Sequence, residues 1–133
     1  MANILIVEDE DHLRVLAESY LREHGHVTFS AATKEQALAA LEVAKIDLLF
    51  VDVGLYDDRQ VGLDLAKEAV EQFPEMKVLY TTGQSVTDGM KALLVENAAL
   101  LPKPYTVEQL QTILALKFGF KPVSAPVAPI PLS

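Results

Sequence analysis

The amino-acid sequence predicts an α/β domain built as a doubly wound parallel sheet of five strands in (βα)5 order. Two observations lead to this prediction. Short apolar runs alternate five times with amphipathic stretches, which is typical of strands buried on both faces of a sheet and joined by helical crossovers. Four of the runs also end at acids, hydroxyls or a lysine, and ligands collect at the carboxyl ends of such strands. The pattern therefore predicts both a fold and the edge of the sheet at which a site lies.

The first strand and the first helix have the clearest pattern. An apolar run at residues 4–7 predicts the strand. The helix after it carries apolar residues spaced i, i+3, i+4, i+7 and i+8, which predicts one buried stripe made of Leu13, Leu16, Ala17, Tyr20 and Leu21. Gly25 ends this helix in a C-cap position, and a short second strand is expected at residues 27–30.

Capping boxes predict the start of the second and the last helix. In a capping box, two residues three positions apart each accept, with the side chain, a hydrogen bond from the backbone N–H of the other. The two boxes are Thr33 with Gln36 and Thr106 with Gln109. The second helix runs to about residue 44 with Leu38 and Leu41 inward. Tyr105 and Leu110 sit at the positions of a hydrophobic staple in the last helix. The buried face of that helix is predicted to contain Val107, Leu110, Ile113 and Leu114.

The middle of the chain predicts a loop and two more helices. After the strand that ends at Asp52, residues 54–61 form the loop, and a third helix then stops before Pro74. Its inward residues are predicted to be Leu63, Ala66, Val70 and Phe73. A fourth helix is expected at about residues 86–96, although Gly89 weakens it.

The helical periodicity ends at about Phe118. Residues 1–117 are therefore predicted to form one domain, which fits the length of 133 residues. Residues 118–133 are rich in proline and small side chains, which cannot form a helix or a central strand. We expect this segment to be an extended or disordered tail.

Composition and charge limit the classes of function. The formal net charge is −8 and the pI is about 4.7, which argues against unaided binding to nucleic acid or to an anionic membrane. The chain has no cysteine, so thiol chemistry and disulfides are excluded. The first apolar run is too short for a signal peptide or a membrane span, and we expect a cytoplasmic location.

The residues at the strand ends form a set suited to phosphoryl chemistry. Carboxylates at Glu8, Asp9 and Asp52 would repel one another by about 4 kcal/mol per pair at 4 Å and an effective dielectric of about 20, so they need a cation. Oxygen ligands with room for water suit Mg²⁺. Lys103 offers a compact positive charge, and Thr81 or Thr82 offers a hydroxyl. One carboxylate could accept a phosphoryl group while metal and lysine neutralise the developing charge.

Four motifs resemble the receiver domain of bacterial response regulators in two-component systems. They are ILIVEDE at residues 4–10, DLLFVD at 47–52, Thr81-Thr82-Gly83 and Lys103-Pro104. They occur in the order and spacing of the family and cover about residues 1–117. The resemblance implies the flavodoxin-like receiver topology for the sheet. It also implies that Asp52 is the phosphoacceptor and that the phosphoryl group comes from a histidine kinase or a histidine phosphotransfer protein.

The resemblance implies Mg²⁺ as the cofactor and assigns its ligands. Asp9 and Asp52 would bind the metal, Glu8 would act through a bound water, and the Gly54 backbone carbonyl would complete the site. Thr82 would supply the switch hydroxyl, because Gly83 follows it where the family has a small residue. Lys103 would bind the phosphoryl group, beside a cis Lys103–Pro104 bond.

One departure from the family pattern concerns how phosphorylation is read out. Receivers usually carry an aromatic residue three positions before the lysine, and here that position is Leu100. Residues 79–83 are similar to a subgroup of receivers, often free-standing or attached to hybrid kinases, that lack this aromatic switch. We therefore expect phosphorylation without the usual aromatic reporter.

The resulting prediction is a single-domain response regulator. It would signal through protein–protein contacts and would not be an enzyme beyond catalysing its own phosphotransfer and slow dephosphorylation. A second hypothesis is a non-phosphorylated, receiver-like adaptor that only binds partners. A third is a flavodoxin-like nucleotide or flavin binder, but no glycine-rich loop follows the first strand, and Glu8-Asp9 would repel a phosphate there.

Overall fold

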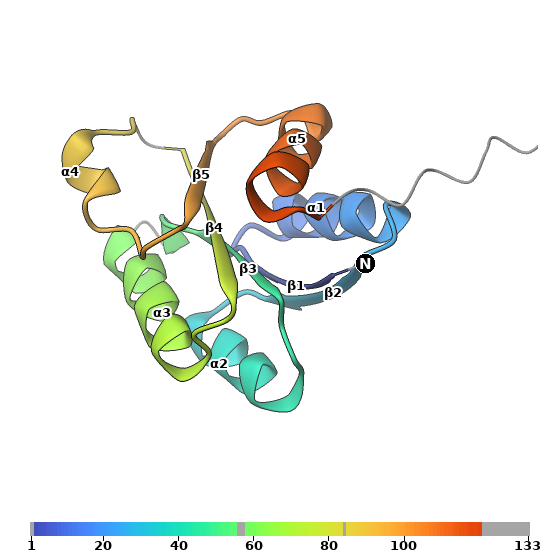
Figure 1. Cartoon of the computed structure of the whole chain (residues 1–133), viewed down its shortest axis with the longest axis horizontal. Coiled ribbons are helices and arrows are strands. Elements are labelled where there is room, and N and C mark those ends of the chain that lie inside the picture. The colour runs from blue at the N-terminus through green and yellow to red at the C-terminus, as the bar shows by residue number, and fades with distance from the viewer. Residues whose placement is uncertain (1, 56–57, 84, 121–133) are drawn as a thin grey trace, which may run out of the picture.

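The fold is a single five-stranded parallel sheet with helices on both faces. The computed structural model describes residues 2–55, 58–83 and 85–120. The strands are β1 (Asn3–Val7), β2 (Val27–Ala31), β3 (Leu48–Asp52), β4 (Lys77–Thr82) and β5 (Ala99–Pro102). The helices are α1 (Asp11–Glu23), α2 (Lys34–Val43), α3 (Arg59–Gln72), α4 (Asp88–Lys91) and α5 (Val107–Phe118). The strand order is β2-β1-β3-β4-β5, so the predicted (βα)5 doubly wound fold is confirmed (Figure 1).

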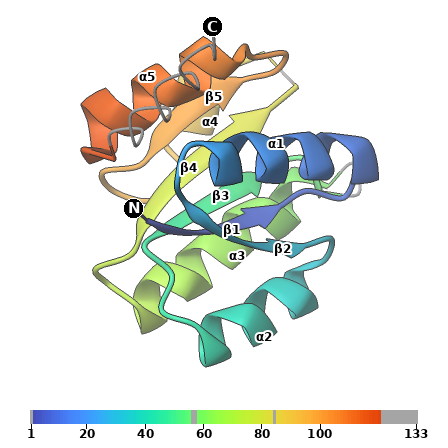
Figure 2. The same ribbon diagram turned by 90° about the vertical axis from the view of Figure 1, so that its right-hand side faces the viewer.

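The hydrophobic core is divided by the sheet into two clusters. Successive side chains of a strand point to opposite faces, so Leu48 and Phe50 of β3 join one cluster while Leu49 and Val51 join the other. Figures 1 and 2 show α1 and α5 on one face and α2 and α3 on the other. Because both faces are covered, β3 is buried along its whole length, as an apolar run that does not alternate predicts.

Two of the side chains expected inside α1 and α5 are exposed instead. Leu16 is 63% exposed and Val107 is 45% exposed, so the prediction that they are buried was wrong. Both line a groove of about 600 Å³ between the two helices. The helices do not close over each other there, and the sheet-facing stripe of α1 is carried by Ala17 and Leu21. Gly25 has a φ of 86°, which confirms its expected place at the end of α1.

The two capping boxes differ in the structure. At α5 both bonds form: Gln109 N–H donates to Thr106 Oγ1 at 3.0 Å, and Thr106 N–H donates to Gln109 Oε1 at 2.8 Å. At α2 only the first half forms, with Gln36 N–H donating to Thr33 Oγ1 at 3.0 Å. The side-chain oxygen of Gln36 accepts instead from the N–H of Ala32, so the predicted box is wrong in its reciprocal half.

Helix α3 begins earlier and α4 is shorter than predicted. Asp58 caps α3 with its side chain, so the helix starts inside the predicted loop. It ends at Gln72, and Phe73, predicted to face inward, is the C-cap residue and is 37% exposed. Helix α4 spans only Asp88–Lys91, not residues 86–96. The N–H of Val95 donates to the Tyr80 hydroxyl, which is incompatible with a continuing helical bond.

The C-terminal part of the described chain packs on the core. Gly119 follows α5 with a φ of 73°, Phe118 is buried, and the Phe120 ring stacks on it with centroids 6.1 Å apart. The fold therefore continues three residues past residue 117, the predicted end of the domain. The rest of the predicted tail, residues 121–133, lies outside the described residues. Among the described helices, none has the length and apolar character needed to cross a lipid bilayer.

Candidate functional site

The predicted site residues meet at the carboxyl edge of the sheet. Strands β1, β3, β4 and β5 are neighbours in that order and parallel, so their carboxyl ends lie side by side. Glu8 follows β1, Asp52 ends β3, Thr82 ends β4 and Lys103 follows β5. The topology therefore brings residues 95 positions apart in the chain into one pocket.

The Lys103 ammonium binds two acids at once. Its Nζ lies 2.6 Å from Glu8 Oε1 and 3.1 Å from Asp52 Oδ2. The carboxylate side chains are each only 7% exposed, so these charge-assisted bonds are strong compared with surface ion pairs. The other oxygen of Asp52, Oδ1, accepts from the Gly54 N–H at 2.9 Å. Both Asp52 oxygens are therefore held, and the carboxylate has one defined orientation.

The charges in the pocket are coupled. Burial and, to a smaller extent, the neighbouring Asp52 carboxylate together raise the pKa of Glu8 to about 7, against the opposing effect of Lys103. Burial alone would lower the pKa of Lys103, but its bonds to Glu8 and Asp52 outweigh this effect and raise it. The lysine therefore stays charged at neutral pH.

Three carboxylates fit a divalent metal ion. Glu8, Asp9 and Asp52 each offer an oxygen, and these oxygens lie within 4.8 Å of one another. An all-oxygen set of this kind suits a hard cation such as Mg²⁺, which keeps several waters. The residues present therefore fit the metal that the sequence predicted. Gly54 lies next to these acids, because its N–H donates to Asp52. That its carbonyl binds the metal stays a prediction.

Backbone bonds hold the strand ends together beneath the pocket. Lys103 N–H donates to the Thr82 carbonyl at 2.7 Å, and Val53 N–H donates to the Thr81 carbonyl at 2.8 Å. The Lys103–Pro104 peptide bond is cis, as the family resemblance implied. Thr82 is 1% exposed, so the predicted switch residue is packed at the end of β4.

The two threonines of β4 belong to opposite faces of the sheet. Leu79 packs in the cluster under α1 and α5 and Tyr80 in the other, so alternation places Thr81 on the α1–α5 side and Thr82 on the α2–α3 side. Thr81 is also the register partner of Asp52. The structure thus gives the two hydroxyls different surroundings, which the sequence left open.

Sequence reasoning missed the part played by Gly62. This residue lies in the first turns of α3, and a β-carbon there would be 2.5 Å from the Asp52 carbonyl oxygen and 2.9 Å from Val53 Cα. Only glycine lets the helix approach the end of β3 this closely. The available signal was a glycine within an otherwise apolar helical pattern.

The fold and the site together define a class: an α/β protein with an acidic, metal-fitting pocket that contains a lysine at the strand ends. Residues 4–115 match the family model of the response regulator receiver domain. This chain therefore belongs to the receiver family of two-component systems.

Similar proteins include regulators and a kinase. The chain is 31% identical to the KDP operon transcriptional regulatory protein KdpE of Escherichia coli, over 99% of the chain and 57% of that protein. It is 30% identical to the sensor kinase CckA of Brucella abortus, over 84% of the chain and 12% of that protein. It thus spans little more than half of KdpE, and a quarter of the regulator NtrX of Azorhizobium caulinodans.

Solved structures share the fold. NtrX from Brucella abortus has a TM-score of 0.80 at 29% identity, covering 89% of this chain and 27% of that one. A CheY-like receiver domain from Methanospirillum hungatei has a TM-score of 0.78 at 24% identity, covering 90% of this chain and 94% of that one. The second likeness supports the receiver fold alone.

Proposed function

We propose that this chain is a response regulator receiver that accepts a phosphoryl group on Asp52 from a histidine kinase or a histidine phosphotransfer protein, with Mg²⁺. The proposal is based on the position and the hydrogen-bond partners of Asp52. Its carboxylate lies at the end of β3, is held by Gly54 N–H and Lys103 Nζ, and faces two further acids that fit a metal. A nucleophile held in one orientation beside groups that neutralise charge is suited to phosphoryl transfer.

The proposed step is a displacement at phosphorus. An Asp52 oxygen forms a bond to the phosphorus of a phosphohistidine, the P–N bond breaks, and the imidazole leaves with its electron pair and then takes up a proton. Lys103 moves from pairing with the Asp52 carboxylate to pairing with a phosphoryl oxygen, and the Thr82 hydroxyl donates to another. A bound Mg²⁺ supplies Lewis-acid neutralisation of the charge that develops.

The partners and the output belong to the same proposal. The chain would act as a signalling domain in the cytoplasm, through protein–protein contacts, and its catalysis would be limited to its own phosphotransfer and slow dephosphorylation. The groove between α1 and α5 borders the pocket through Glu8 and Lys103, so a partner that reaches Asp52 has surface to bind beside it.

The experiment uses acetyl phosphate and beryllofluoride as small phosphodonor and phosphoryl mimic. The wild-type protein with Mg²⁺ should gain one phosphoryl mass and respond to beryllofluoride. Asp52→Asn should do neither, and EDTA should abolish both in the wild type. Asp64→Asn, on α3 and away from the pocket, is the matched control and should behave as the wild type.

Two outcomes would reject the proposal. Equal labelling of wild type and Asp52→Asn would place the phosphoryl group elsewhere. No labelling together with no Mg²⁺ binding at millimolar concentrations would favour the non-phosphorylated adaptor.

A further inference from the structure

Thr81 carries a buried hydroxyl without a partner. The residue is 4% exposed, and its Oγ1 is the one fully buried side-chain oxygen among the described residues that makes no hydrogen bond. Leaving such a group unsatisfied costs about 1–3 kcal/mol. Most buried polar groups in folded proteins bond to protein or to an ordered water. The Thr81 hydroxyl has no protein partner, so an ordered water is expected beside it.

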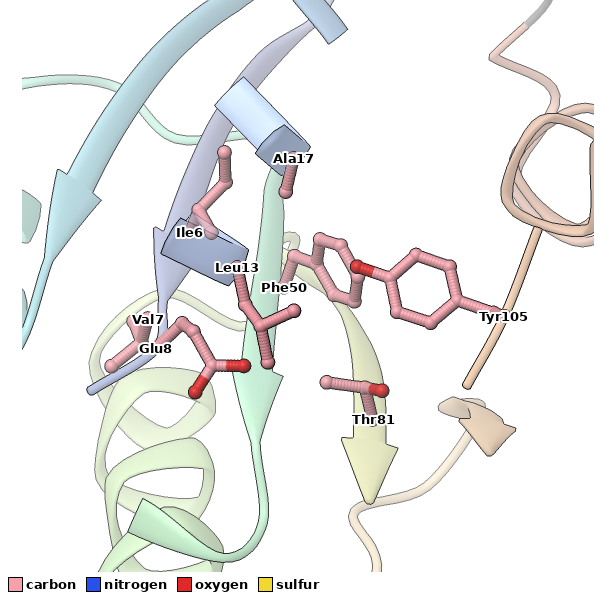
Figure 3. Close-up of a pocket in the computed structure, with 8 residues that line it drawn as sticks. All are labelled: Ile6, Val7, Glu8, Leu13, Ala17, Phe50, Thr81 and Tyr105. Carbon is pink, nitrogen blue, oxygen red and sulfur yellow. The ribbon is translucent and has the colours of Figure 1, made fainter. Parts of the chain in front are cut away.

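Thr81 lines a small cavity beside the acid pocket. The cavity measures about 10 Å³ and shares the lining residues Glu8, Leu13, Ala17 and Tyr105 with the groove between α1 and α5. Figure 3 shows the carboxylate of Glu8 and the side chain of Thr81 at two sides of this space, with the Tyr105 ring beside them. The remaining lining is apolar and comes from Ile6, Val7, Leu13, Ala17 and Phe50.

The cavity has the size and the polarity for one water. A single water needs roughly 10–15 Å³ for its centre and two to four polar partners, whereas truly empty cavities are apolar. Glu8 can serve as a partner, because a carboxylate accepts about four hydrogen bonds. Its Oε1 accepts from Lys103 at 2.6 Å, and its Oε2 accepts from the Glu10 N–H at 3.4 Å, a distance too long for a strong bond.

We propose that one buried water occupies this cavity and bridges the Thr81 hydroxyl to the Glu8 carboxylate. The water accepts the hydroxyl proton of Thr81 in a hydrogen bond and donates to Glu8. The arrangement satisfies the buried hydroxyl and gives the carboxylate a donor in addition to Lys103. Thr81 then holds Glu8 from the α1–α5 side of the sheet, opposite to the side on which Thr82 lies.

The bridge makes Thr81 a positioning residue for the metal site. This role rests on the proposed function, in which Glu8 contributes to binding Mg²⁺. The presence of the water does not depend on the proposed function. Partners that orient metal-site ligands from behind typically change metal affinity by 10–100-fold when they are removed. Because the bridge acts on Glu8 through a water, we expect an effect of about tenfold, the lower end of that range.

A crystal structure of the whole chain without Mg²⁺ tests the water directly. It should show density for one water within about 2.7–3.2 Å of both Thr81 Oγ1 and a Glu8 oxygen. Thr81→Val keeps the shape but removes the hydroxyl and should lose the water, while Thr81→Ser should retain it. An empty cavity in the wild type, or a Thr81 hydroxyl bonded directly to a protein group, would overturn the proposal.

Calorimetric titration with Mg²⁺ tests the positioning role. Thr81→Val should bind about tenfold more weakly, Thr81→Ser should restore the affinity, and Thr112→Val on the exposed side of α5 should match the wild type. Wild-type affinity in Thr81→Val, with the water lost, would overturn the positioning role. Failure of the wild type itself to bind Mg²⁺ would instead count against the proposed function, and circular dichroism melts of each variant separate either result from misfolding.

Discussion

The hydroxyl of Tyr80 accepts a 3.0 Å hydrogen bond from the backbone N–H of Val95, which ties the segment after α4 to the middle of β4. Tyr80 is completely buried, and burial raises the pKa of its hydroxyl, which therefore stays protonated. In the ladder between β4 and β5, Tyr80 is the register partner of Leu100. The aromatic ring at this level of the sheet thus lies on β4, opposite Leu100, which occupies the β5 position where receivers usually carry an aromatic residue.

We expect Tyr80→Phe to loosen the segment between α4 and β5. The change keeps the ring but leaves the half-buried N–H of Val95 without its acceptor. A fully buried donor left unsatisfied costs about 1–3 kcal/mol, so we expect a loss near the lower end of that range. Urea denaturation should show this loss, and amide exchange at Val95 should accelerate relative to β3. Tyr20→Phe is the control, because Tyr20 is only half-buried whereas Tyr80 is fully buried, so loss of the Tyr20 bond to Gln111 should cost less. Equal losses in the two variants would contradict the structural role of the Tyr80 bond.

Gly62 controls how closely α3 approaches the end of β3. Gly62→Ala would place a β-carbon 2.5 Å from the Asp52 carbonyl oxygen, so either the helix or Asp52 must shift. Overpacking of this kind typically costs about 1–3 kcal/mol. We expect lower stability in urea and slower labelling by acetyl phosphate, because Asp52 leaves its position beside Lys103.

Gly89→Ala is the matched control for Gly62. Its β-carbon would come no closer than 3.8 Å to another group, the Thr87 hydroxyl oxygen. Alanine is the better helix former, by about 0.8–1.0 kcal/mol in a helix interior. We therefore expect Gly89→Ala to be neutral or stabilising. A loss of stability in this variant equal to that of Gly62→Ala would mean that the close approach at Asp52 is not the cause.

Sequence pattern was sufficient for the sheet and most of the pocket because both depend on local signals. An apolar run predicts a buried strand, and parallel strands necessarily bring their carboxyl ends to one edge. Glu8, Asp52 and Lys103 therefore converge as predicted. Their bonding could not be read from the sequence, since the shared lysine depends on side-chain directions at the ends of β1, β3 and β5.

The errors arise where contacts between distant segments decide the outcome. Periodicity gives a stripe on α1 but does not show that α5 leaves a groove beside it, so Leu16 was placed inside. Likewise, α4 ends early where Val95 bonds a tyrosine 15 residues away in the chain. The unpartnered hydroxyl of Thr81 is of the same kind, because it appears only when β1, β3 and β4 are packed under α1.

We expect His26 to make stability fall in mild acid. The ring is buried, its Nδ1 accepts from the Ala2 N–H at 3.2 Å, and burial, helped by the nearby His24, lowers its pKa. Below about pH 6.5, the ordinary pKa of histidine, the unfolded chain takes up a proton that the folded protein does not. The free energy of unfolding should therefore decrease as the pH falls from about 6.5 towards the lowered pKa, with no contribution from His26 above neutrality.

Urea denaturation across this range measures the effect of His26. His26→Gln, which keeps a side-chain acceptor, should flatten the pH dependence relative to the wild type. His12→Gln should leave it unchanged, because the His12 side chain is 74% exposed. A wild-type slope in His26→Gln would show that other groups cause the acid sensitivity.

We expect Mg²⁺ to compensate in part for the stability lost when Lys103 is replaced. Lys103→Met leaves Glu8 and Asp52 buried and close together without a cation, and breaking a buried ion pair from one side typically costs about 3–5 kcal/mol. Because the pKa of Glu8 is about 7, protonation can relieve part of the repulsion in mild acid. The destabilisation in EDTA should therefore be larger at about pH 8 than at about pH 6.

Addition of Mg²⁺ should restore part of this loss, because the metal neutralises the same carboxylates. Ligand binding to the folded state alone adds about 1.4 kcal/mol at ten times its dissociation constant. Lys34→Met is the control: its ion pair with Glu68 is at the surface and contributes about 0–1 kcal/mol, independent of Mg²⁺. Thermal melts of both variants with and without Mg²⁺ distinguish the two cases. If Mg²⁺ stabilised Lys103→Met no more than Lys34→Met, then lysine and metal would not share the acids of this pocket.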